Sequence, residues 1–99
     1  MSIPFTQYLR PYGTPTDITI DRPPHVEALA REVIDAGYVF EAEVLTTGEV
    51  SLTVFDLNEE EDVCIELAGD KNGVPAAVDK LVNDAVRLVR ERAAAKETP

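Results

Sequence analysis

Cysteine, histidine and tryptophan are nearly absent from this chain of 99 residues, which contains one Cys, one His and no Trp. The single Cys64 excludes an intramolecular disulfide, so nothing points to an oxidising compartment. Cys64 and His25 together cannot supply the four protein ligands of a structural zinc site. The sequence also places no acid, base or nucleophile beside His25, and no glycine-rich loop is followed by a phosphate-binding Lys-Ser/Thr pair. We therefore expect a protein that is not an enzyme and that carries no metal or cofactor.

Basic residues and long apolar runs are scarce as well. Nine Lys and Arg stand against 19 Asp and Glu, which gives a formal net charge of −10. Such a chain has no positive field to attract a phosphate backbone, so we expect no nucleic-acid binding and favour partners with a basic surface. No run of about 18 apolar residues exists, and residues 1–5 lack the basic start and apolar continuation of a secretory leader. These absences predict a cytoplasmic protein that makes no use of a membrane.

The negative charge is concentrated in the middle of the sequence. Residues 38–72 contain ten acidic residues and one Lys, a net charge of −9, whereas residues 1–24 sum to zero and residues 73–99 to +1. Concentrated charge on a folded surface attracts partners of the opposite sign. It also keeps a small domain soluble without any partner, and the sequence leaves both interpretations open.

Length and composition predict a single folded domain over residues 1–99. Two β-rich segments, 5–10 and 17–21, are separated by turn-forming residues and predict a hairpin. Pro23 and Pro24 then begin a helix that ends near Gly37, because apolar residues recur at helical spacing between them. A second, longer helix starts at Pro75 by the same pattern, and its end, residues 93–99, is expected to fray.

A second hairpin is predicted directly after the first helix. Residues 38–45 and 50–55 alternate apolar and polar side chains on either side of a three-residue loop that ends at Gly48. This loop length places Val44 opposite Val50 and gathers the apolar side chains on one face. A two-residue loop would mix core and solvent positions, so only the three-residue loop agrees with the hydrophobic pattern.

A further strand, residues 63–67, follows a charged turn at residues 58–61. The predicted order is therefore β-β-α-β-β-β-α, an α+β two-layer sandwich with a mainly antiparallel sheet and both helices on one face. Whether the first hairpin extends the edge of this sheet or folds across it stays open. Alternation in the last strand predicts that Val63, Ile65 and Leu67 face the core and that Cys64 and Glu66 face solvent.

The face of the sheet without helices is the main candidate for a functional site. The predicted register makes Val39 and Phe55 an apolar pair on this otherwise polar, acidic face. Such a composition is typical of a protein-binding surface, although it also suits a face that is merely solvated. Like charges would oppose self-association through this face, so we expect a monomer or a weak homodimer. The candidate binding residues are Val39, Glu41, Glu43, Ser51, Thr53, Phe55 and Glu66.

Residues 56–62 suggest an alternative, because oxygen-bearing side chains alternate along this turn as they do in a calcium loop. A calcium loop also requires Gly at its sixth position and Glu at its twelfth, and here these positions hold Glu61 and Leu67. A polar turn accounts for the segment better than a specific metal site. A small-molecule or divalent-cation binding domain that uses this turn is therefore the alternative function.

Two resemblances add to this interpretation. The element order over residues 25–96 is similar to that of the double-stranded-RNA-binding domain, but residues 73–78 lack that family's Lys-rich cluster, so RNA binding is not expected. Other stretches resemble short uncharacterised proteins encoded by phages and prophages, which implies a viral accessory role. Taken with the acidic face, this predicts a non-catalytic protein-binding module that modulates or occludes a host protein. The stretches are Tyr8-Leu9-Arg10-Pro11, Arg22-Pro23, Gly37-Tyr38, residues 40–53 and residues 74–79.

Overall fold

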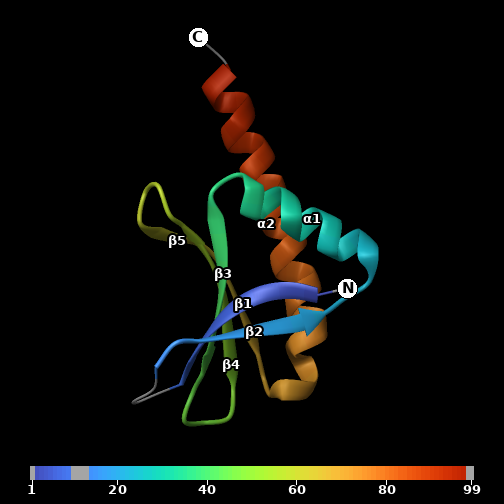
Figure 1. Ribbon diagram of the computed structural model, residues 1–99, viewed down its shortest axis with the longest axis vertical. Helices are drawn as coiled ribbons and strands as arrows, with labels where there is room; N and C mark the ends of the chain where they lie inside the picture. The colour runs from blue at the N-terminus through green and yellow to red at the C-terminus, as the bar shows by residue number, and fades with distance from the viewer. Residues whose placement is uncertain (1, 10–13, 98–99) are drawn as a thin grey trace.

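The computed structural model describes residues 2–9 and 14–97, which form a five-stranded sheet and two long helices (Figure 1). The predicted α+β order is confirmed. Residues 10–13, which include part of the turn predicted in the first hairpin, lie outside the described residues. The elements are β1 (Ser2–Leu9), β2 (Thr16–Asp21), α1 (Pro24–Asp35), β3 (Tyr38–Val44), β4 (Val50–Asp56), β5 (Glu61–Ala68), a short 3-10 turn (Lys71–Gly73) and α2 (Val74–Glu97).

The strands lie in the order β2-β1-β3-β4-β5. Three of the four neighbouring pairs are antiparallel, and β1 runs parallel to β3 through the pairing of Thr6 to Leu9 with Glu41 to Val44. The sheet is therefore mainly antiparallel, as predicted, but mixed. The first hairpin extends the sheet beyond β3, which decides the question that the sequence left open.

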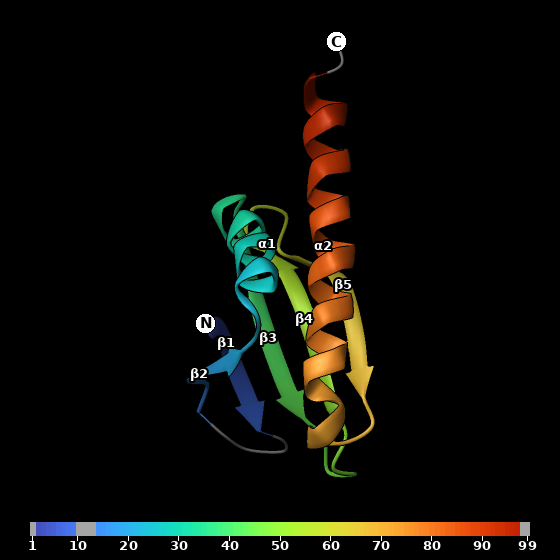
Figure 2. The same cartoon turned by 90° about the vertical axis from the view of Figure 1, so that its right-hand side faces the viewer.

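Both helices cover the same face of the sheet, with α1 packed on β1 and β3 and α2 on β4 and β5 (Figure 2). The core lies between these two layers, where the rings of Phe5 and Phe40 pack 5.2 Å apart between centroids. Other fully buried core residues are Ile3, Val33, Leu52, Val54, Val78, Leu81 and Val82. The opposite face of the sheet is not covered by any element of the described chain, so this face is the one available to partners.

The hairpin of β3 and β4 has the predicted register. Val44 lies opposite Val50, and Val39 lies opposite Phe55. The amide of Gly48 donates to the carbonyl of Leu45 at 3.0 Å, and Gly48 adopts a φ of 92°, so the three-residue loop is confirmed. This register places Glu41, Glu43, Ser51 and Thr53 on the open face.

The predicted side-chain directions in β5 are wrong for the four residues from Cys64 to Leu67, whereas Val63 packs against the core as predicted. A bulge at the step from Val54 to Phe55 leaves Val63 without a partner of its own, so Cys64 lies opposite Val54 and Glu66 opposite Leu52. One extra residue in a strand turns every following side chain to the other face. Cys64, Glu66 and Ala68 therefore face the helices, whereas Ile65 and Leu67 face solvent and are 63% and 55% exposed.

Two bidentate ion pairs join the helical layer across the fold. Arg22 Nε donates to Asp79 Oδ1 at 2.7 Å, which fastens the segment before α1 to the first turns of α2. Arg90 Nε donates to Glu32 Oε2 at 2.8 Å and links the second halves of the two helices. The helix α2 is regular as far as Glu97, including residues 93–97, for which the sequence predicts fraying. No helix in the described part of the chain is long and apolar enough to cross a membrane.

Candidate functional site: the open face of the sheet

The open face brings together six of the seven predicted site residues. They come from two neighbouring strands, β3 and β4, whose register aligns them in rows across the sheet. All six side chains are half-buried, so they form the floor of a broad surface rather than isolated projections. They are Val39, Glu41, Glu43, Ser51, Thr53 and Phe55.

The seventh predicted residue, Glu66, does not belong to this face. The bulge in β5 turns it toward α2, where its Oε1 lies 3.3 Å from Lys80 Nζ. Glu66 is therefore part of the contact between the sheet and the helical layer, and its assignment to the binding surface is wrong.

Two apolar residues that the sequence assigned to the core take its place. Ile65 lies opposite Thr53 and Leu67 opposite Ser51, so both extend the rows of the open face to the edge strand. Phe55 is diagonal to Ile65 across the same pair of strands, a spacing at which large side chains still interact. The face is therefore acidic over β3 and apolar toward β5.

On its β1 side, the open face extends past the acidic residues of β3 to Thr6 and Tyr8. Tyr8 lies opposite Glu43 in the parallel pair, and Thr6 lies opposite Glu41. A hydrogen bond from the Tyr8 hydroxyl to the Glu41 carboxylate raises the pKa of Tyr8 above its usual value, and burial and the charge of Glu41 add to the effect. The hydrogen bond holds the Glu41 side chain in place on the surface, with Tyr8 as its aromatic neighbour.

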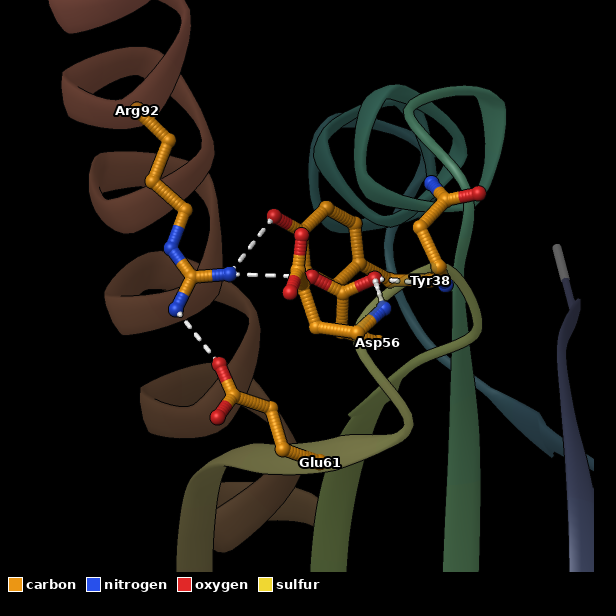
Figure 3. A network of polar contacts seen from close by, with 6 residues as sticks. Tyr38, Asp56, Glu61 and Arg92 are labelled. Atoms are coloured by element: carbon orange, nitrogen blue, oxygen red, sulfur yellow. Dashed lines mark hydrogen bonds and ion pairs between the residues drawn. The ribbon is translucent and has the colours of Figure 1, made fainter.

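The 56–62 turn is organised by Asp56, whose side chain is buried (Figure 3). Asp56 Oδ1 accepts hydrogen bonds from the amides of Asn58 at 2.8 Å and Glu59 at 3.2 Å. The other oxygen, Oδ2, accepts from Arg92 Nη1 at 3.0 Å. Both carboxylate oxygens of Asp56 are therefore engaged within the protein, which disfavours the cation-binding alternative at this turn.

Arg92 completes this network from α2. Its Nη1 also donates to the Tyr38 hydroxyl at 3.2 Å, and its Nη2 donates to Glu61 Oε1 at 3.2 Å. These bonds raise the pKa of Arg92, so the guanidinium is fully charged. A hollow of about 340 Å³ beside the network is lined by these residues and by the end of α2. The network fastens the β4–β5 turn to α2, so its role is to stabilise the fold.

The other titratable candidates stand apart from one another. Cys64 lies against the helical layer, where burial, followed by the negative charge of Asp84, raises the pKa of its thiol. A raised pKa opposes the thiolate form that a nucleophile needs. His25 is exposed in the first turn of α1. Across residues 2–9 and 14–97, no three His, Cys, Asp or Glu side chains gather into a group that could hold a metal ion.

Comparison with protein-family models gives no match, and comparisons with curated proteins and with solved structures give none either. The role of the open face therefore has to follow from its own chemistry. Sequence reasoning found the acidic part of that face but missed Ile65 and Leu67, because their alternation fits a buried strand equally well. The contact between Glu66 and Lys80, which reveals the true orientation, exists only in the folded chain.

Proposed function

We propose that this protein is a non-catalytic acidic protein-binding module that docks through the open face of its sheet. The observation that carries the proposal is the arrangement of Glu41 and Glu43 beside the apolar pair of Val39 and Phe55 on an uncovered face. Protein interfaces combine an apolar centre with a polar rim, and opposite charge guides the encounter. The partner we propose is a protein with a basic surface.

We further propose that the protein acts as a phage or prophage accessory protein, which modulates or occludes a host protein through this face. The support for this origin is the sequence resemblance described above. The net charge of −9 over residues 38–72 supports the electrostatic part of the proposal, because β3, β4 and β5 lie within this stretch. Occlusion needs a surface and an opposite charge, and it needs no catalytic group on this chain.

The test is an affinity pull-down from host lysate at low and at high salt, followed by identification of the retained proteins by mass spectrometry. The wild type is compared with a Glu41→Lys/Glu43→Lys variant. A control variant, Asp35→Lys/Glu60→Lys, has the same net charge but changes two exposed residues in other parts of the surface. We expect one host protein to be retained by the wild type and the control at low salt and lost with the open-face variant.

Retention that is equal for all three proteins would contradict docking through this face. An empty eluate at both salt concentrations would contradict the protein-binding function itself. In that case the acidic face would serve solubility. The small-molecule alternative would then be tested by screening ligands for changes in the signals of Tyr38 and of the 56–62 turn.

A further inference from the structure

The ladder between β1 and β3 covers only part of the two strands. The paired residues are 6–9 of β1 and 41–44 of β3, whereas the described residues 2–5 and 38–40 form no pairs with each other. Pro4 lies in the unpaired part of β1, where it cannot donate a hydrogen bond to a ladder. Figure 1 shows β1 running obliquely to β3. The two strands therefore diverge at this end of the sheet.

A hollow of about 660 Å³ lies where the two strands diverge, and its size is within the range of about 300–1,000 Å³ that is usual for small-molecule pockets. Val39 lines the hollow from the open face. The buried rings of Phe5 and Phe40, which pack 5.2 Å apart between centroids, line it from the side of the core. Ile34 of α1 adds an apolar wall from the helical layer. The hollow thus reaches from the open face toward the core between mainly apolar walls.

The charged group at this hollow is a carboxylate. Asp17 of β2 is exposed and lies opposite Thr6, which also lines the hollow. Among the described residues that form the walls, Asp17 carries the only charge. Its side chain forms no hydrogen bond or ion pair with any described residue. The carboxylate is therefore available to a ligand.

The wider surroundings of the hollow have the same sign of charge. Glu41 lies on the other side of Thr6 from Asp17, in the same row across the sheet. Since neighbouring strands lie about 4.8 Å apart, the backbones of Asp17 and Glu41 are about 10 Å from each other. The whole chain has a formal net charge of −10. These charges attract a cation to the hollow and disfavour an anion.

We propose that this hollow binds a small amphiphilic cation, an organic molecule with an apolar body and one ammonium group. The apolar body packs between Val39 and Ile34, and the ammonium group lies at the mouth beside Asp17. Apolar walls with a few placed polar groups are the usual composition of a small-molecule site. The 56–62 turn contributes no described residue to these walls. The site needs no protein partner, so it does not depend on the proposed docking function.

Titration of the isotope-labelled protein with tryptamine, followed by amide chemical shifts, tests the site. Tryptamine joins an indole ring to an ammonium group. Two matched probes are indolepropionate, which has the same ring and a carboxylate, and ethylamine, which has the ammonium group without the ring. We expect saturable shifts centred on Thr6, Thr19, Ile34 and Phe40 with tryptamine, at a Kd of about 1 mM. Indolepropionate should bind about three- to tenfold more weakly at low salt, and ethylamine should give no saturable shifts at these residues.

Three results would overturn the proposal. The first is the absence of saturable shifts with tryptamine up to about 5 mM. The second is equal shifts with ethylamine, because they would show that the acidic surface attracts any cation and that the apolar walls take no part. The third is a set of saturable shifts centred away from the hollow.

Reversing the charge at the mouth tests the role of Asp17. Asp17→Lys should weaken the binding of tryptamine about three- to tenfold and make indolepropionate the tighter ligand. The control Asp21→Lys has the same net charge and changes an exposed residue of the same strand that does not line the hollow. This control should keep the wild-type order of the two probes. If tryptamine stayed the tighter ligand of Asp17→Lys, or if both variants behaved alike, the placement of the cation beside Asp17 would be refuted. Because no host protein enters these titrations, their failure would leave the docking proposal standing.

Discussion

The buried Asp56 gives the sharpest test of what holds the β4–β5 turn to the helical layer. Replacing Asp56 with Ala removes the acceptor for the amides of Asn58 and Glu59, and each lost hydrogen bond costs about 0.5–1.5 kcal/mol. It also removes the partner of Arg92, although that guanidinium is 35% exposed and keeps its bonds to Tyr38 and Glu61. Breaking a fully buried pair costs about 3–5 kcal/mol, which sets an upper bound here. We expect Asp56→Ala to lower the free energy of unfolding by about 2–4 kcal/mol.

Urea denaturation followed by circular dichroism measures this loss, which should lower the midpoint by about 1–2 M. Asp56→Asn keeps a carbonyl oxygen for the turn but loses the charge, so its effect should lie between those of the wild type and Asp56→Ala. The control Glu61→Gln removes the exposed partner of the same Arg92 and should cost less than about 1 kcal/mol. If Asp56→Ala were no more destabilising than Glu61→Gln, the view of Asp56 as the organiser of the turn would be refuted.

Two further predictions concern titratable groups. The bidentate bond from Arg90 lowers the pKa of Glu32, so this pair stabilises the fold above the unfolded pKa of about 4.3 and loses its effect as the pH falls through the lower folded value. Urea midpoints of the wild type and Glu32→Gln should therefore differ at neutral pH and converge in acid, and a constant difference would contradict the assignment. Burial raises the pKa of the Cys64 thiol, so its reaction with a thiol reagent at neutral pH should be much slower than that of a cysteine placed at the exposed position 57. Equal rates would show that Cys64 is not held against the helices.

Local signals were sufficient to predict the β3–β4 hairpin residue by residue. Its three-residue loop fixes the register, and the register fixes which side chains share a face, so the pairing of Val39 with Phe55 follows without tertiary information. The parallel pairing of β1 with β3 had no such signal, because α1 and β2 separate the two strands in the sequence and no short loop sets their alignment. The sequence could therefore predict the acidic centre of the open face, but not its continuation to Tyr8.

The orientation of β5 shows how one residue can invert a correct pattern. Val63, Ile65 and Leu67 alternate as buried residues do. Ile65 and Leu67 would join Val63 against the core if Val63 were paired with Val54. The bulge instead pairs Cys64 with Val54. Contacts between β5 and the helix α2 account for this register. Cys64 and Ala68 are small enough for α2 to lie close above β5, and Glu66 meets Lys80 on the helix. None of these contacts is visible in the strand's own alternation.

The inverted strand also has an energetic consequence for function. Burying a side chain such as Ile or Leu stabilises a fold by about 1.5–3 kcal/mol, and Ile65 and Leu67 forgo most of this gain while Glu66 is turned inward. The isolated chain gains nothing from exposing these two residues. A partner surface that covers these two side chains recovers the loss. The same bulge that makes the sequence prediction wrong thus adds an apolar edge to the open face, next to the acidic residues of β3 through which we propose that the protein binds its partner.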